Sequence, residues 1–132
     1  MYWFASADLL IAQHKYQQAF QLFDSIILKF PYHSLGDEIL IKKSKAMQQQ
    51  GKWSEALSYL DELLKYYGTD ILADDALFMK GEIYQNHLMD TQKAMDCYKA
   101  ILFNHKGSLF TIEARKRFRE LRGDVNNEDE EL

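Results

Sequence analysis

The sequence repeats one helical pattern three times, at a spacing of 37–38 residues. The clearest copy is GKWSEALSYLDELLKYYG, residues 51–68, which has the i, i+4, i+7 spacing of a single apolar helix face. The same plan starts 37 residues earlier in HKYQQAFQLFDSIILKFP and 38 residues later in DTQKAMDCYKAILFNHK. Because one such unit cannot bury its apolar side alone, the three copies are predicted to stack against one another.

A second helix precedes each of these segments, and its copies also align at 37 residues. The aligned positions are Trp3, Leu40 and Leu77; Ala7, Ser44 and Gly81; and Leu10, Met47 and Tyr84. The middle set is small in every copy, which predicts that the paired helix crosses closely there with its own Ala19, Ala56 or Ala94. A glycine inside a helix costs about 1 kcal/mol relative to alanine, so Gly81 is expected to serve packing.

Periodicity and end signals predict seven helices. They are expected at 2–13, 16–30, 35–50, 53–67, 71–87, 91–104 and 109–122. Ser34, Asp70, Asp90 and Ser108 are the expected N-terminal caps, and Pro31, Gly51, Gly68 and Gly123 are the expected stops. The acidic end, residues 123–132, is too poor in apolar groups to order itself and is predicted to be a disordered tail.

Length and charge exclude several classes of protein. A chain of 132 residues suits one domain, and a net charge of −4 offers no basic surface for nucleic acid. The lone Cys97 cannot form an internal disulfide, and no apolar run approaches the ~18 residues of a membrane span.

The order of large, small and aromatic residues in each helix pair resembles the tetratricopeptide repeat. The matching residues are Trp3, Ala7, Leu10, Ala19, Phe23 and Pro31; Leu40, Ser44, Met47, Ala56, Leu60 and Gly68; and Leu77, Gly81, Tyr84, Ala94 and Tyr98. The resemblance implies an all-α, right-handed α-solenoid of three helix hairpins (about 2–31, 35–68 and 71–106) and a C-terminal capping helix (109–122), together a domain of residues 1–122. The spacing exceeds the usual period of about 34 residues, with the excess between repeats.

A narrower resemblance concerns these longer loops. KFPYHSLGDEI, YYGTDILADDALFMKGEIY and GSLFTIEARKRFREL are similar to segments of a long-loop subgroup found in bacterial cell-envelope proteins, including outer-membrane-assembly lipoproteins and Tol–Pal-associated proteins. This resemblance alone implies a periplasmic or outer-membrane-associated location. A cytoplasmic location stays open.

The two ends of the repeat array differ. In 109–122 a bulky residue stands at the position that is small in the repeats: Phe118 when counted from Gly81, or Arg119 when counted from Ala94. This suits a capping helix, on which no further helix packs. Its expected apolar face is Ala114, Phe118 and Leu121, with Ile112 nearby. Its cations are expected on a solvated outer face: Arg115, Lys116, Arg117, Arg119 and Arg122. At the other end, residues 2–4 enter a helix without a cap, which predicts either further repeats upstream or coverage by a second chain.

No constellation of residues indicates catalysis. His14, His33, His87 and His105 fall in separate turns without metal-ligand spacing, and Cys97 is expected to be a buried, inert thiol. The sequence has no phosphate-binding glycine loop, nucleophile elbow or HExxH motif. We therefore expect a protein that is not an enzyme, with no cofactor and no metal.

The family resemblance implies that the first helix of each pair lines a concave groove for a protein or peptide partner. The matching positions are Phe4, Asp8, Ile11, Ile41, Lys42, Lys45, Gln48, Phe78, Met79, Glu82 and Gln85. Phe4, Ile41 and Phe78 would form an apolar track in the groove, or alternatively would be partly buried residues of helix packing. Phe4 and Asp8 stand where the family's carboxylate clamp needs Lys and Asn, which disfavours capture of a C-terminal carboxylate.

Two functions follow from this pattern. The first is a scaffold or adaptor that binds a partner segment in the groove. The alternative is an architectural segment whose contacts run end to end with further repeats or with another copy, through the N-terminal edge.

Overall fold

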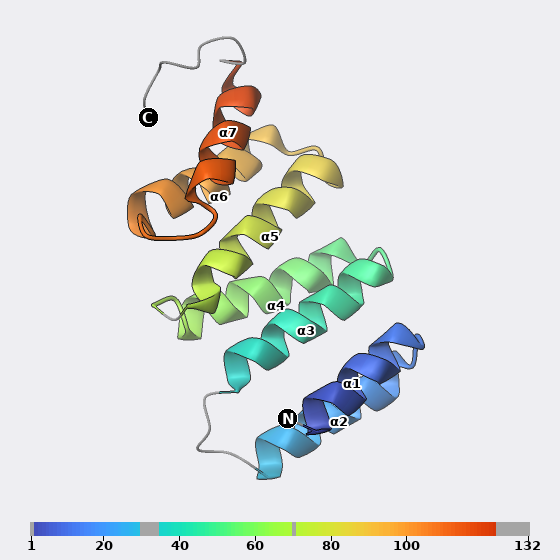
Figure 1. Ribbon diagram of the computed structural model, residues 1–132. Coiled ribbons are helices and arrows are strands. Elements are labelled where there is room, and N and C mark those ends of the chain that lie inside the picture. The colour runs from blue at the N-terminus through green and yellow to red at the C-terminus, as the bar shows by residue number, and fades with distance from the viewer. Residues whose placement is uncertain (1, 30–34, 70, 124–132) are drawn as a thin grey trace. The chain divides into compact units, whose positions relative to one another are not determined.

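The computed structural model describes residues 2–29, 35–69 and 71–123, and these ranges contain seven α-helices and no strand (Figure 1). The helices are α1 (Tyr2–Ala12), α2 (Tyr16–Lys29), α3 (Gly36–Gln49), α4 (Trp53–Tyr66), α5 (Leu72–Asn86), α6 (Thr91–Asn104) and α7 (Thr111–Arg122). The all-α prediction is confirmed. None of the helices in the described ranges has the length and apolar character that crossing a membrane requires.

Side-chain and backbone caps explain several of the helix ends. The Asp90 carboxylate accepts a hydrogen bond from the amide of Lys93 at 3.1 Å, as predicted for the start of α6. Gly51 and Gly123 follow the ends of α3 and α7 with φ of 72° and 99°, a conformation that glycine adopts without strain. Ser34, Asp70, Pro31 and the acidic tail lie outside the described residues.

The start of α7 differs from the prediction. The helix begins at Thr111, not at Leu109, and Ser108 does not cap it directly. The Ser108 hydroxyl instead accepts a hydrogen bond from the Phe110 amide at 3.0 Å, and the Thr111 hydroxyl donates to the Ser108 carbonyl at 2.9 Å. Ser108 therefore orders the turn before the helix, which moves the start of α7 two residues along the chain.

The chain divides into two compact units, residues 1–63 and 64–132. In the first unit, α1 and α2 pair side by side, and their buried residues share a core with those of α3 (Figure 1). The hydroxyl of Ser44 donates to the carbonyl of Ala56 at 2.9 Å, and both residues are fully buried. These are the small residues expected at the crossing of the second helix pair, so that prediction is confirmed.

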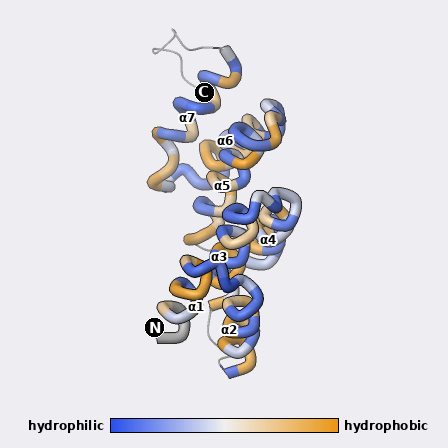
Figure 2. Tube along the Cα trace, turned by 90° about the vertical axis from the view of Figure 1, so that its right-hand side faces the viewer, coloured by the Kyte–Doolittle hydropathy of each residue, from blue (hydrophilic) through white to orange (hydrophobic). Residues whose placement is uncertain are grey.

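The second unit contains α5, α6 and α7 around one apolar core. Buried Tyr98 of α6 lies directly against Gly81 of α5, where a Cβ atom would come within 2.6 Å of the tyrosine ring. Ala114 and Phe118 of α7 belong to the same core. Hydrophobic and hydrophilic residues alternate along most of the helices (Figure 2), as expected for helices with one side in a core, while Asp8 is the only charged residue in the sequence of α1.

Two details of α7 correct the prediction for its faces. Arg117 was expected on the solvated outer face, but it points onto Phe78 of α5, with the guanidinium carbon 4.8 Å from the ring centroid. Ile112 was expected near the apolar face, yet 78% of its surface is exposed. Both depend on how α7 docks against α5 and α6, because the periodicity of a short helix does not by itself fix the limits of the side that it buries.

Candidate functional site

In the first unit, two of the residues predicted to line the groove form an ion pair. The ammonium of Lys42 on α3 lies 2.7 Å and 3.0 Å from the two carboxylate oxygens of Asp8 on α1. The Asp8 side chain is more than half exposed, so water screens the pair and its contribution to stability is modest. The pair nevertheless joins the first helix of one repeat to the first helix of the next.

The second unit holds a similar pair. One guanidinium nitrogen of Arg117 on α7 lies 3.3 Å from a carboxylate oxygen of Glu82 on α5. Glu82 falls 74 residues, two repeat lengths, after Asp8, and the two pairs have sequence separations of 34 and 35 residues. The acidic members therefore stand at equivalent repeat positions, whereas the basic members differ by one position, because Lys42 corresponds to Lys116 and the pair is made by Arg117.

Arg117 is the centre of a larger network. Its Nε donates to Glu113 at 3.0 Å, and its Nη1 donates to the Tyr98 hydroxyl at 3.3 Å as well as to Glu82. The Tyr98 hydroxyl in turn donates to the side-chain carbonyl of Gln85 at 2.6 Å. A planar guanidinium suits this role because its five N–H groups can serve several acceptors at once.

The network shifts two pKa values. Burial raises the pKa of the Tyr98 hydroxyl above its ordinary value, while the hydrogen bond from Arg117 and its charge act in the opposite direction. Partial burial disfavours the charged form of Arg117, but the hydrogen bonds to Tyr98 and Glu113 and the charge of Glu82 outweigh it and raise the pKa. Arg117 therefore keeps its positive charge at neutral pH.

The apolar residues predicted for the groove are mostly inside the units. Ile11, Ile41 and Phe78 are each no more than 8% exposed. Phe78 stacks on Phe110, with ring centroids 4.7 Å apart, and also contacts Tyr98. For Ile41 and Phe78 this burial agrees with the alternative of helix packing; the side chain of Phe4 lies outside the described residues.

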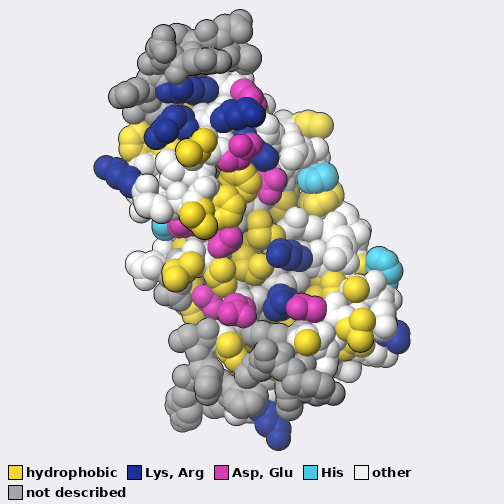
Figure 3. All heavy atoms as spheres, viewed as in Figure 1, with side chains coloured by type: hydrophobic (Ala, Val, Ile, Leu, Met, Phe, Trp, Pro, Cys, Tyr) yellow, Lys and Arg dark blue, Asp and Glu magenta, His cyan; other side chains and the backbone are white. Residues whose placement is uncertain are grey.

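The remaining predicted positions are polar or half-buried. Gln48 donates to the Ser44 hydroxyl at 3.3 Å, and Met79 is half-buried. Lys45 is exposed and forms no hydrogen bond or ion pair with another of the described residues. Figure 3 shows a face of the molecule on which acidic and basic side chains lie beside hydrophobic ones.

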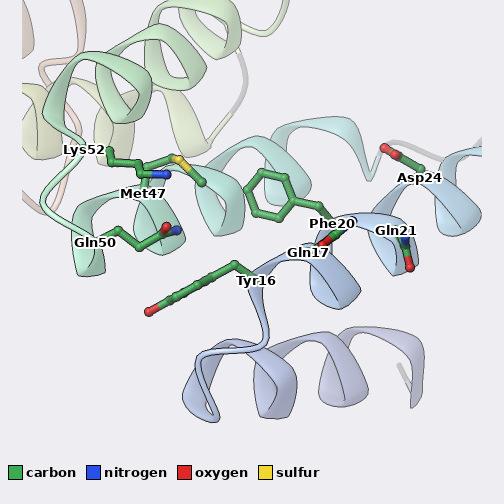
Figure 4. A pocket seen from close by; sticks show the side chains of 8 residues that line it. All are labelled: Tyr16, Gln17, Phe20, Gln21, Asp24, Met47, Gln50 and Lys52. Carbon is green, nitrogen blue, oxygen red and sulfur yellow. The ribbon is translucent and has the colours of Figure 1, made fainter.

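A separate hollow of about 470 Å³ lies in the first unit, on the side of α2 (Figure 4). Tyr16, Phe20 and Met47 form its apolar walls, and the other lining residues are Gln17, Gln21, Asp24, Gln50 and Lys52. Lys52 and Asp24 lie at opposite ends of the view. The ammonium of Lys43 on α3 lies 5.4 Å from the ring centroid of Phe20 and 3.6 Å from the Asp24 carboxylate. The carboxylate at this end of the hollow is therefore paired with a lysine of α3.

Other polar groups have structural roles. Nδ1 of His105 lies 2.7 Å from a carboxylate oxygen of Asp74, which links the end of α6 to the start of α5. Cys97 is buried, as predicted. Within the described part of the chain, no cluster of three or more His, Cys, Asp or Glu side chains could hold a metal ion.

Sequence reasoning missed Arg117 and Tyr98 as members of this site. Two signals were present. Glu113 precedes Arg117 by one helical turn, the spacing of a helix ion pair, and the acid-to-base separation of about 35 residues occurs in both units. Neither signal shows by itself that the arginine turns inward.

The chain matches the family model of the tetratricopeptide repeat in two places, residues 38–69 and 75–108. The first match spans α3 and α4, the second spans α5 and α6, and together they cover half of the chain. Comparison with curated proteins and with solved structures gave no significant match. The repeats, the helix pairs and the closely packed crossings at Ser44 and Gly81 agree with the matched model, and the chain belongs to the tetratricopeptide repeat family.

Proposed function

We propose that this protein is a non-enzymatic interaction module that holds a segment of a partner protein on its first-helix face, the surface formed by the exposed predicted positions on α1 and α3 of the first unit. Tetratricopeptide repeats generally mediate protein–protein interactions, and the family is typically a scaffold without catalytic activity. The proposal therefore concerns what the protein binds and includes no reaction.

The proposal rests on the exposed side chain of Lys45. Its neighbour one turn earlier, Lys42, is held by Asp8, whereas Lys45 extends into solvent without a described partner. Lys45 stands at the repeat position that Asp8 and Glu82 occupy in the other repeats, so the charge at that position is reversed. An exposed cation on this face attracts a carboxylate of the bound segment.

The test places a photo-crosslinking amino acid at position 45 and, as a matched control, at exposed position 58 of α4. We expect a partner adduct from position 45 and none from position 58. We expect Lys45→Glu to weaken binding of the partner so identified and Lys45→Arg to preserve it, with unchanged circular dichroism in both variants. Adducts of equal yield at both positions would contradict the proposal, and an adduct between two copies of the chain would support end-to-end association instead.

Ile41 and Phe78 are unsuitable positions for a test by substitution. Both side chains are buried, so charged substitutions there would disturb folding as well as binding. Lys45 avoids this problem because its side chain packs in no core.

The proposal extends to the bacterial cell envelope as the place of action. Its support is the resemblance of the inter-repeat loops to the long-loop subgroup, together with a repeat spacing of 37–38 residues. Fractionation of cells that express the tagged full-length gene product tests it. Recovery in the periplasmic or outer-membrane fraction is expected, and recovery only in the cytoplasm would exclude this location.

A further inference from the structure

The junction between α6 and α7 carries a surface hollow of about 300 Å³. It is lined by Leu102, Phe103, Lys106, Thr111 and Arg115. Pockets that hold whole small molecules start at about this size, so the α6–α7 hollow suits one bulky side chain better than a cofactor. None of its lining residues belongs to the first-helix face.

Large apolar side chains in the segments that form this hollow face water. Phe103, which lines it, is 52% exposed. Leu109, in the turn before α7, is 99% exposed, and Ile112, in the first turn of α7, is 78% exposed. Three such residues within ten positions form an apolar surface that favours burial against another molecule.

The charges at the α6–α7 hollow all have one sign. Both charged lining residues, Lys106 and Arg115, are cations, and the ammonium of Lys99 lies 5.8 Å from the ring centroid of Phe103. The acidic residue in the first turn of α7, Glu113, is bound to Arg117 instead. The local charge is therefore opposite to the chain's net charge of −4.

We propose that the α6–α7 hollow binds an acidic peptide segment of another protein through one bulky apolar side chain. The apolar side chain enters the hollow against Phe103, and flanking carboxylates pair with Lys106 and Arg115. Complementary charge supplies orientation and a fast encounter, and apolar burial supplies much of the affinity. A hollow that admits a single side chain favours a peptide over an anionic lipid surface, which needs a continuous apolar face to insert.

The test uses a fluorescein-labelled peptide with one central Trp flanked on both sides by Glu and Asp. One control peptide has Ala in place of the Trp, and a second has Gln and Asn in place of the acids. Fluorescence anisotropy with the full chain is expected to show binding of the first peptide and weaker binding of both controls. Equal binding of all three peptides would overturn the proposal.

Variants of the chain locate the binding. Lys106→Glu combined with Arg115→Glu is expected to weaken binding at least about tenfold. The matched control is Lys15→Glu, in the turn between α1 and α2, combined with Lys65→Glu on α4; both positions are exposed. It makes the same change in net charge and is expected to leave binding unchanged. Ile112→Ser should weaken binding without altering circular dichroism, because this side chain packs in no core. Equal loss in both double variants would mean unspecific attraction and would overturn the proposal.

Two further arms separate the remaining possibilities. In the first arm, the acidic residues of 124–132 are replaced by Asn and Gln in the full chain, so that they cannot compete with the acidic peptide. If the peptide binds neither this variant nor the wild type, the proposal is overturned. Vesicles containing phosphatidylglycerol provide the alternative surface, and binding to vesicles but not to the peptide would also overturn it. Lys45→Glu should leave peptide binding intact, which separates this site from the first-helix face.

Discussion

Gly81 of α5 and Tyr98 of α6 occupy a single close crossing, in which a Cβ atom on residue 81 would lie 2.6 Å from Cε1 of the tyrosine ring. Real Cβ atoms do not approach a ring so closely, and the ring cannot move freely because its hydroxyl is bound to Gln85 and Arg117. A glycine in the middle of a helix is thus required by the tyrosine packed on it. The small side chain is a condition of the fold of this repeat.

Gly81→Ala is expected to destabilise the protein by about 1–3 kcal/mol, as overpacking usually does, although alanine is the better helix former. Urea unfolding followed by far-ultraviolet circular dichroism measures the change. Gly107→Ala is the control, because a Cβ there would have no neighbour within 4 Å. A Gly81→Ala variant as stable as the wild type would show that α6 shifts to admit the methyl group.

Ser44→Ala is expected to destabilise the first unit by about 1 kcal/mol, because the buried carbonyl of Ala56 loses its hydrogen-bond donor. Ser44→Leu should be worse, since it also forces a large side chain into the crossing. Both Trp residues, Trp3 and Trp53, belong to the first unit, so tryptophan fluorescence during urea unfolding follows it selectively. Ser58→Ala, at an exposed position of α4, is the neutral control.

Stability is expected to fall above the ordinary tyrosine pKa of about 10, in part because of Tyr98. Its pKa in the folded state is raised, so the folded protein keeps the proton in a pH range where the unfolded chain has lost it. This contribution is complete below the unfolded-state pKa and is lost as the pH rises through the folded-state pKa.

Urea unfolding at a series of alkaline pH values, for the wild type and for Tyr98→Phe, isolates this effect. The wild type should lose more stability than the variant over the same interval, because phenylalanine has no proton to release. Parallel curves would rule out Tyr98 as a source of the alkaline sensitivity.

The ion pairs Asp8–Lys42 and Glu82–Arg117 are expected to differ in strength. A double-mutant cycle for Asp8 and Lys42 should give a coupling free energy of about 0.2–1 kcal/mol that decreases with salt, as exposed pairs do. The cycle for Glu82 and Arg117 should give a larger and less salt-sensitive value, because Glu82 is less exposed than Asp8 and the guanidinium rests on Phe78. Asn and Gln replace the acids, and Met replaces the bases. Equal couplings with equal salt dependence would contradict this expectation.

Local patterns predicted most of the fold. Six helices lie within one residue of the expected bounds at each end, because apolar periodicity and residues such as Gly51 and Asp90 act within a few positions. The close packing at Gly81 also followed from repetition, although the atoms nearest to it belong to Tyr98 and not to the expected Ala94. These features are set by neighbours in sequence, and sequence therefore reveals them.

Less of the candidate site could be predicted. Arg117 is one of five cations on a twelve-residue helix, and nothing in that run distinguishes the one that turns toward Phe78. Its direction depends on the rotation of α7 against α5 and α6, a tertiary property. The same applies to Ile41 and Phe78, which an amphipathic pattern places on the edge between the buried and exposed sides.

The two recurring ion pairs also have a polarity. In each unit the carboxylate belongs to the earlier helix and the cation to the later one. In the middle repeat the acidic position holds Lys45, so a first helix that followed α3 in the same way would find no carboxylate there. Surface charge thus encodes the sequence in which such hairpins can be concatenated, and this offers a simple rule for joining them into longer artificial arrays.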